Sequence, residues 1–289
     1  MTILDQVRTT GLLMDGAMGS RLMQKGMKSN VVPEIMNLEK PDMVLEVHQE
    51  YLTAGADVIT TNTLGGTRLK LKKAGLAHLT ANVNQAACQI ARQAAGKIHF
   101  VAGDIGSVGE ILEPFGTLSQ AEAVENFQEQ ARLLAESGVD CFIIETMFDV
   151  RECQAAIQGV RAVSDLPLFA TMTFEKNPTG FNTIMGNFAP ESMQMLAQAG
   201  ADAVGANCSI GSGSMVELAK IIRKSVTLPV IIQPNAGIPE IRDSGLVYPE
   251  SPAEYARNLK AIRDLGVEII GGCCGTTPEY IRAIRQLIS

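Results

Sequence analysis

The chain has 289 residues and a formal net charge of −7; 46% of its residues are hydrophobic, 4% are aromatic, and tryptophan is absent. This composition argues against binding to nucleic acid or to an anionic membrane. The first residues lack a signal-peptide layout, and no apolar run approaches the roughly 18 residues of a membrane span. Six cysteines are too few for a disulfide scaffold in a chain this long. We therefore expect a soluble, cytoplasmic protein with reduced thiols.

Eight short apolar runs are typical of strands, and one helical pattern separates nearly every pair of them. The runs begin near Leu12, Asp57, Ile98, Asp140, Pro167, Asp202, Pro229 and Val267. Apolar strands that alternate with helices favour a parallel sheet buried on both faces. We predict an α/β fold, a single (β/α)8 TIM barrel that covers residues 1–289 as one domain. A doubly wound sheet is disfavoured because the turn after the first strand, Asp15-Gly16-Ala17-Met18-Gly19, lacks the Gly-x-Gly-x-x-Gly spacing.

One pattern recurs four times along the chain: a glycine, a small apolar residue, an acid and then a strand. Each glycine follows an amphipathic helical segment, such as residues 121–137 or 190–199, which predicts a left-handed helix end at the glycine. The acids lie at strand starts, the stability face of a barrel, so we interpret them as structural. They are Asp57, Asp140, Asp202 and Glu268. Residues 20–40 and 105–118 form longer connections after the first and third strands, and both are candidate walls or lids of an active site.

The carboxyl ends of the predicted strands carry polar side chains, which a barrel would gather around its mouth. None of the three histidines lies at a strand end, so a Ser–His or Cys–His nucleophile has no evident partner. Asp15 and Glu145 lie at this end, and either ammonium binding or ordinary loop hydrogen bonding would explain them. The full ring comprises Asp15, Thr61, Asn62, Asp104, Glu145, Thr146, Thr173, Asn207, Cys208, Asn235, Cys273 and Cys274.

Three of these strand-end residues are cysteines, and they follow the sixth and eighth strands. The flanking glycines in Gly271-Gly272-Cys273-Cys274-Gly275 allow a sharp turn, so both sulfurs can face Cys208. Three thiolates and an open fourth position are typical of a catalytic zinc, which would lower the pKa of an incoming thiol. A redox or metal-sensing switch with a Cys273–Cys274 disulfide, or simple packing, remains an alternative. We expect Cys88, Cys141 and Cys153 to be small buried hydrophobic residues.

Five motifs in this order resemble the homocysteine S-methyltransferase family, and they look most like the homocysteine-binding module of cobalamin-dependent methionine synthase. The resemblance covers about residues 11–287. Its motifs are Met14-Asp15-Gly16-Ala17-Met18-Gly19, Thr61-Asn62-Thr63, Gly205-Ala206-Asn207-Cys208-Ser209, Gln233-Pro234-Asn235-Ala236-Gly237 and Gly271-Gly272-Cys273-Cys274-Gly275-Thr276. The sequence departs from these relatives at Ser20-Arg21 and Leu64-Gly65-Gly66, which affects the wall that would meet the methyl donor.

The resemblance implies a zinc-containing barrel in which Cys208, Cys273 and Cys274 are the metal ligands, with the Asn235 oxygen as a weak fourth ligand before substrate binds. It implies that Asp15 and Glu145 hold the homocysteine ammonium group. Gly16, Thr61 and Asn207 are then expected nearby, and the glycine-rich turn would hold the carboxylate.

The expected activity is transfer of a methyl group to homocysteine, which gives methionine. Because the chain ends with the last barrel helix, we expect the donor to come from outside, as methylcobalamin on a separate corrinoid protein. S-methylmethionine or betaine are alternative donors, although betaine would require an aromatic cage. Another small thiol is an alternative acceptor, and a thiol-binding subunit without turnover of its own is an alternative role.

Overall fold

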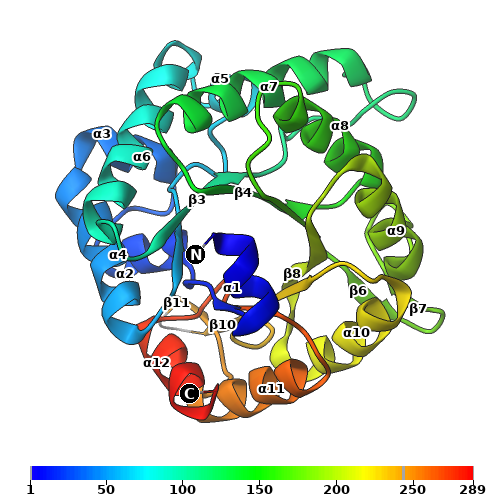
Figure 1. The fold of residues 1–289 in the computed structure, drawn as a ribbon. Helices are drawn as coiled ribbons and strands as arrows, with labels where there is room; N and C mark the ends of the chain where they lie inside the picture. Colours follow the sequence, from blue (N-terminus) through cyan, green and yellow to red (C-terminus); the bar gives the residue numbers. More distant parts are fainter. Residues whose placement is uncertain (1, 243–244, 289) are drawn as a thin grey trace.

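The computed structural model describes residues 2–242 and 245–288 of the chain. Its centre is a parallel sheet of eight strands in the order β1-β12-β9-β8-β5-β4-β3-β2, and a bridge between Met14 and Val58 joins its two edges. The described residues therefore form the predicted single barrel (Figure 1). The strands are β1 (Leu12–Leu13), β2 (Val58–Thr60), β3 (Phe100–Ile105), β4 (Cys141–Met147), β5 (Leu168–Met172), β8 (Ala203–Gly211), β9 (Val230–Asn235) and β12 (Ile269–Ile270).

Helices surround the barrel as an outer ring (Figure 1). The two predicted helical segments, 121–137 and 190–199, are α7 and α9 and begin one residue earlier than expected. The helices are α1 (Ile3–Thr9), α2 (Met18–Gln24), α3 (Met36–Glu39), α4 (Pro41–Ala54), α5 (Arg68–Lys73), α6 (Thr80–Ala95), α7 (Gln120–Glu136), α8 (Val150–Arg161), α9 (Ala189–Ala199), α10 (Ser212–Ser225), α11 (Pro252–Asp264) and α12 (Pro278–Ile288), with the short 3-10 turns η1 (Pro33–Ile35) and η2 (Ala77–Leu79).

The four acids of the repeated pattern are structural clamps at the amino ends of the strands. Each carboxylate accepts the N–H of a residue on the neighbouring strand: Leu13 (2.8 Å), Val101 (2.7 Å), Leu168 (2.9 Å) and Val230 (2.8 Å) for Asp57, Asp140, Asp202 and Glu268. Each also pairs with an arginine of an outer helix, namely Arg285, Arg92, Arg161 and Arg223. The preceding glycines are left-handed, as predicted, with φ of 108° at both Gly55 and Gly200. These clamps join the strands in pairs.

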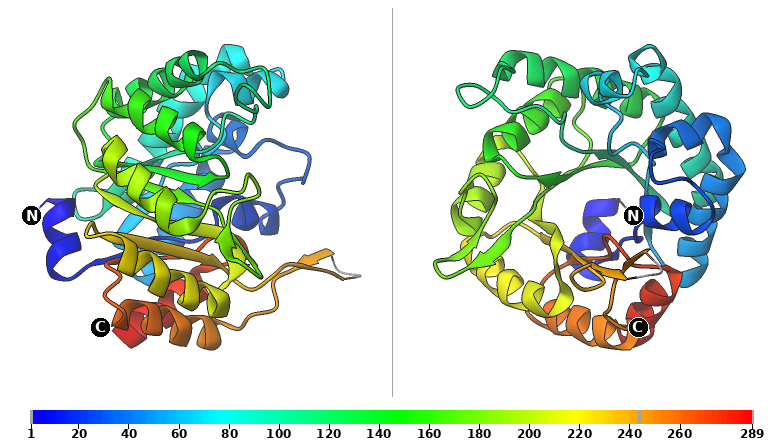
Figure 2. Two further views of the ribbon diagram at one scale, coloured as in Figure 1. Left: turned by 90° about the vertical axis from the view of Figure 1, so that its right-hand side faces the viewer. Right: turned by 180° about the vertical axis from the view of Figure 1, so that it is seen from behind.

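Two apolar layers hold the barrel together. Side chains that point inward, such as Ile143 and Phe169, form an inner cluster, and Ile3 and Val7 of α1 complete it from the amino end. A larger cluster fills the space between strands and outer helices. Because α1 covers one end of the barrel interior, only the other end is available for a site (Figures 1 and 2).

The carboxyl ends of the strands carry the long connections. Two antiparallel hairpins lie in these connections: β6 (Glu175–Asn177) with β7 (Gly180–Asn182), and β10 (Glu240–Arg242) with β11 (Gly245–Val247). In the left view of Figure 2, the second hairpin projects from the side of the barrel opposite α1. No helix in the described residues is long and apolar enough to cross a membrane.

Candidate active site at the barrel mouth

Three free thiols converge at the mouth of the barrel. Cys208 lies near the end of β8, and Cys273 and Cys274 follow β12; β9 is the one strand between these two. The three Sγ atoms lie within 4.8 Å of one another, and those of Cys208 and Cys274 are 3.9 Å apart. None is in a disulfide. The sequence prediction that these sulfurs face one another is confirmed.

Local backbone distortions aim these sulfurs. The ladder between β8 and β9 shifts register after Asn207, and Cys208 and Ser209 adopt left-handed φ values of 63° and 60°. Non-glycine residues rarely adopt this conformation, and it is concentrated at functional sites. Below Cys273, a Cβ on Gly272 would lie 2.3 Å from the Thr276 Oγ1, so this close turn requires glycine.

The thiol cluster has the properties of a site for a soft divalent metal. Hydrogen bonds from Cys208 and Cys273 lower the pKa of Cys274, so the fold already stabilises one thiolate among the three sulfurs. Close by, the Oδ1 atom of Asn235 is buried without a hydrogen-bond partner among the described residues. The backbone N–H of Ala236 binds the carbonyl of Cys274 at 3.0 Å, which places Asn235 next to the cysteine pair. Three thiols and an unpaired oxygen fit a four-coordinate zinc.

A cavity of about 270 Å³ lies against the thiols, and polar groups from several strand ends line it. Four of the lining residues are acids: Asp15, Glu34, Asp104 and Glu145. The first three are almost fully buried, whereas Glu145 is partly exposed to the cavity. No lysine or arginine is among the described residues that line it. The cavity therefore offers a concentration of negative charge, or of carboxyl protons, without a cation of its own.

Burial changes the acidity of all four carboxyl groups. It raises the pKa of Asp15 to about 7, although the Thr60 N–H (2.8 Å) and hydroxyl donate to this carboxylate. Burial, with added repulsion from Cys208 and Asp15, raises the pKa of Glu145 to about 8. The pKa values of Asp104 and Glu34 are raised as well, again mainly by burial. A cation that enters the cavity would stabilise the ionised form of each carboxyl group.

Four of the six predicted substrate residues line this cavity, and two do not. Asp15, Gly16, Thr61 and Glu145 line it. Asn207 and Asn235 do not belong to its lining, and Asn207 lies behind it. The Asn207 side chain has its own partners: its Oδ1 accepts from the Thr146 N–H (2.9 Å), and its Nδ2 donates to the Thr146 hydroxyl (2.7 Å).

Three residues of the site had no role assigned from the sequence: Glu34, Asp104 and Tyr248. Glu34, from the 20–40 connection, accepts the N–H of Gly65 at 2.6 Å and points its carboxyl at the cavity. Asp104 belonged to the predicted polar ring, but nothing in the sequence indicated its unpartnered Oδ1. Tyr248, which follows β11, contacts Cys274 through its hydroxyl.

The 20–40 connection forms a wall of the site, as predicted, through Ser20, Met23, Pro33 and Glu34. No residue of the 105–118 connection lines the thiol cavity, so the prediction for that connection is not confirmed. Ser107 of that connection lines a neighbouring hollow, which shares Glu34 and Leu64 with the thiol cavity.

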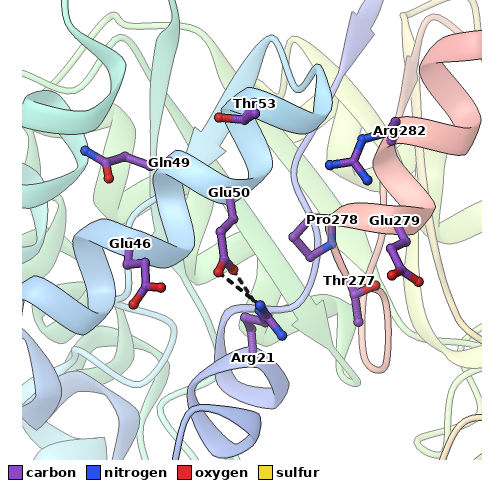
Figure 3. Close-up of a pocket in the computed structure, with 9 residues that line it drawn as sticks. All are labelled: Arg21, Glu46, Gln49, Glu50, Thr53, Thr277, Pro278, Glu279 and Arg282. Atoms are coloured by element: carbon purple, nitrogen blue, oxygen red, sulfur yellow. Dashed lines mark hydrogen bonds and ion pairs between the residues drawn. The ribbon is translucent and has the colours of Figure 1, made fainter.

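A hollow on the flank of the barrel, of about 520 Å³, is a different kind of surface (Figure 3). It lies between α4 and the start of α12. Its Arg21 donates two hydrogen bonds to Glu50, at 2.7 and 3.0 Å, so these charges already compensate each other (Figure 3). None of the thiols or buried acids lines it. We therefore assign the active site to the mouth.

The fold and the thiol cluster together define a barrel that can present a metal to a small thiol. Comparison with known proteins agrees, because the family model of homocysteine S-methyltransferase matches residues 12–288. This chain belongs to the homocysteine S-methyltransferase family.

Methionine synthase from Mycobacterium tuberculosis is 30% identical over 307 aligned positions, which cover 99% of this chain and 25% of that protein. The chain thus spans a quarter of the length of the methionine synthases it matches. Among solved structures, the metallated form of the homocysteine methyltransferase MmuM from Escherichia coli is similar with a TM-score of 0.82 at 21% identity and covers 98% of both chains. Its oxidized form gives a TM-score of 0.79 at 24% identity and covers 99% of this chain and 98% of its own. These likenesses establish a shared fold.

The raised pKa of Asp15 predicts a pH-dependent cost to stability in the absence of ligand. Unfolding returns this carboxyl to its ordinary pKa near 4, so the unfolded state binds fewer protons than the folded state between about pH 4 and 7. The free energy of unfolding should therefore fall with rising pH in that window, by up to about 1.4 kcal/mol per pH unit from this group. Asp15→Asn should remove that part of the slope and gain stability over the wild type as the pH rises.

Urea unfolding of both proteins from about pH 4 to about pH 8, a range that covers the window of about pH 4 to 7, measures the difference. Contributions from the thiols are common to both proteins and cancel. Parallel stability profiles would show that Asp15 does not carry a raised pKa.

Proposed function

We propose that this chain is a zinc-dependent S-methyltransferase that binds homocysteine as a thiolate and methylates it to methionine. One observation carries the proposal: three converging free thiols adjoin a small cavity rich in buried carboxyl groups, with no lysine or arginine among the described residues that line it. A ligand that pairs a thiol with an ammonium group satisfies both halves of this arrangement. Homocysteine has these two groups, and family membership supports the choice.

Cys208, Cys273 and Cys274 would hold the zinc, and the Asn235 Oδ1 is available as an oxygen ligand before substrate enters. When bound, the zinc lowers the pKa of the substrate thiol, so the sulfur is a thiolate at neutral pH. The metallated form of MmuM supports a metal in a barrel of this fold. Because the thiol is activated in this way, the chain needs no histidine base, and none of its histidines lines the cavity.

The cavity acids would orient the substrate. Asp15 and Glu145 would receive the ammonium group, and its arrival would lower their pKa values by direct charge attraction. Two further acceptors in the lining, the Oδ1 of Asp104 and the Oε1 of Gln233, are buried and have no partner among the described residues. An ammonium group donates three hydrogen bonds, so acceptors that wait for donors fit it better than they fit an anion.

In the transfer itself, the substrate sulfur donates an electron pair to the methyl carbon, and the bond from methyl to donor breaks with its pair leaving on the donor. The residues of the chain hold the sulfur and the amino-acid end, which fixes the direction of attack. Fixed geometry of this kind is a large part of catalysis for a two-reactant step.

The metal assignment predicts a sharp division between the three mouth cysteines and the buried cysteines Cys88 and Cys153. Cys208→Ala, Cys273→Ala and Cys274→Ala should each lose bound zinc and methyl transfer, because each removes one of three ligands. Cys88→Ala and Cys153→Ala should keep their zinc and their methyl-transfer activity, since these thiols are buried away from the mouth. Elemental analysis of the purified variants measures the zinc. Full zinc retention in any of the first three variants would overturn the ligand assignment.

The substrate assignment predicts that Glu145→Gln separates acceptor binding from metal binding. Loss of the carboxylate should weaken homocysteine binding by roughly tenfold or more, the usual cost of one charged hydrogen bond. Zinc content should not change, because Glu145 is not a ligand. Calorimetric titration with homocysteine and metal analysis of the same sample distinguish the two. Zinc loss in this variant would show that the roles are wrongly divided.

For the donor, we propose methylcobalamin carried by a separate corrinoid protein. Several exposed apolar side chains belong to the connections at the mouth, which is where a protein-borne methyl group would have to approach. They are Met23, Leu64, Ile111, Phe115, Phe148, Ile184, Met185, Phe188, Ile238 and Ile241. Contiguous apolar patches mark protein interaction sites, and side chains exposed at the mouth could contribute to such a site. The similarity to methionine synthase supports this choice of donor.

A small-molecule donor is the alternative, since MmuM is a homocysteine methyltransferase that this chain matches over 98% of both lengths. S-methylmethionine fits that alternative better than betaine does. A quaternary ammonium donor requires an aromatic cage, and Tyr248 is the one aromatic residue in the described cavity lining.

Matched isoleucine variants at the two ends of the barrel test the corrinoid partner. Ile184 lies at the mouth and is 72% exposed, whereas Ile98 lies before β3 at the opposite end and is 85% exposed. With methylcobalamin on a corrinoid protein, Ile184→Glu should raise KM for that protein several-fold, and Ile98→Glu should not. Both variants should use free methylcobalamin equally.

If the chain forms methionine from homocysteine and S-methylmethionine alone, the methyl donor is the small molecule and the corrinoid proposal is wrong. No methionine from free methylcobalamin, with turnover restored by the corrinoid protein, would identify the chain as a subunit that needs its partner.

A further inference from the structure

A site with three cysteine thiolates faces a problem of selectivity, and this inference rests on the zinc site proposed above. Any thiolate is a nucleophile, so the ligand sulfurs compete with the substrate sulfur for the methyl group. Methylation of a ligand would convert it to a thioether and damage the site permanently. The chain therefore needs a means to make its own sulfurs less reactive than the substrate sulfur.

Each of the three cysteine sulfurs lies beside a donor that is not a cysteine. The Asn207 Nδ2 lies 3.8 Å from the Cys273 Sγ, and the Ser209 backbone N–H lies beside Cys208. The Tyr248 hydroxyl lies beside Cys274 at the edge of the cavity. These donors come from different elements: the left-handed turn of β8 supplies the first two, and the segment after β11 supplies the third.

Tyr248 is placed for this contact by close packing. Its ring lies directly over Gly275, where an added Cβ would be 2.1 Å from the ring carbon Cγ. Gly275 has a φ of 82°, so the turn after Cys274 both requires glycine and leaves room for the tyrosine. Tyr248 also lines the cavity beside Cys273 and Cys274. The hydroxyl is therefore held at the edge of the site rather than free in solvent.

A hydrogen bond to a thiolate stabilises its charge, whereas a thioether is a weak acceptor. Alkylation of a hydrogen-bonded sulfur thus loses most of that stabilisation as the new S–C bond forms. We propose that these donors, with the Tyr248 hydroxyl as the one that reaches from outside β8, direct the methyl group to the substrate by lowering the nucleophilicity of the ligand sulfurs. Tyr248 is then a specificity-determining residue.

The site of alkylation in zinc-loaded protein without homocysteine tests this directly. Iodomethane supplies the methyl group: the sulfur pair forms the S–C bond, and iodide leaves with the electron pair of the C–I bond. In Tyr248→Phe, methylation of Cys274 should become roughly tenfold faster than in the wild type, as expected for loss of one hydrogen bond to a charged group. Cys208 and Cys273 keep their donors, so their rates should stay unchanged. Peptide mass spectrometry measures all three sites in one sample.

Tyr280→Phe is the matched control, because its hydroxyl donates to the Glu250 carbonyl rather than to a sulfur. This variant should behave like the wild type. Zinc content, measured on the same samples, distinguishes failure of the Tyr248 proposal from failure of the proposed function. If the wild type and Tyr248→Phe both bind zinc and Cys274 is methylated at the same rate in each, the role of Tyr248 is wrong and the proposed function stands. Zinc loss in Tyr248→Phe would likewise overturn only the role of Tyr248. A wild-type protein that binds no zinc would overturn the proposed function as well.

Discussion

The parallel pairing of β8, β9 and β12 is the constraint on which the site depends. Parallel strands end at the same edge of a sheet, so Cys208 and the Cys273–Cys274 pair arrive at one end of the barrel although 64 residues lie between them. The ladder alone would leave the sulfurs pointing in alternating directions. The left-handed turn at Cys208 and the glycines around Cys273 and Cys274 correct this. The order of the strands thus brings the three cysteines to the same end of the barrel, and the local backbone conformation turns their sulfurs toward one another.

The acidic cavity shows a conflict between stability and binding. Asp15, Glu34, Asp104 and Glu145 are costly to ionise where they lie, because burial raises each pKa. At the opposite end of the barrel, the repeated acids each bind a backbone N–H and an arginine. The same residue types therefore stabilise one end and await a ligand at the other. The difference is the absence of arginine and lysine from the described lining of the cavity.

Much of this arrangement could be predicted from the sequence. Apolar runs and their spacing gave eight strands that begin within two residues of the observed starts, because a barrel strand must be apolar on both faces. Cysteines placed after two such runs had to meet at the mouth. Glu34 and Tyr248 could not be predicted in the same way. They lie in long connections whose path depends on tertiary packing, such as the Glu34 bond to the Gly65 N–H.

The size of the cavity indicates that the acceptor and the methyl donor would bind at different places, the acceptor inside the cavity and the donor at its rim. A space of about 270 Å³ suits a small amino acid and cannot enclose a corrin ring or a protein-borne group. Under the proposed function, the donor would therefore meet the substrate sulfur at the rim, outside the acidic cavity that would bind the ammonium group. Residues such as Ile184 and Phe115 lie in the connections of this face and do not line the acidic cavity. A homocysteine barrel can thus keep its thiols and acids unchanged while the rim adapts to a different methyl donor.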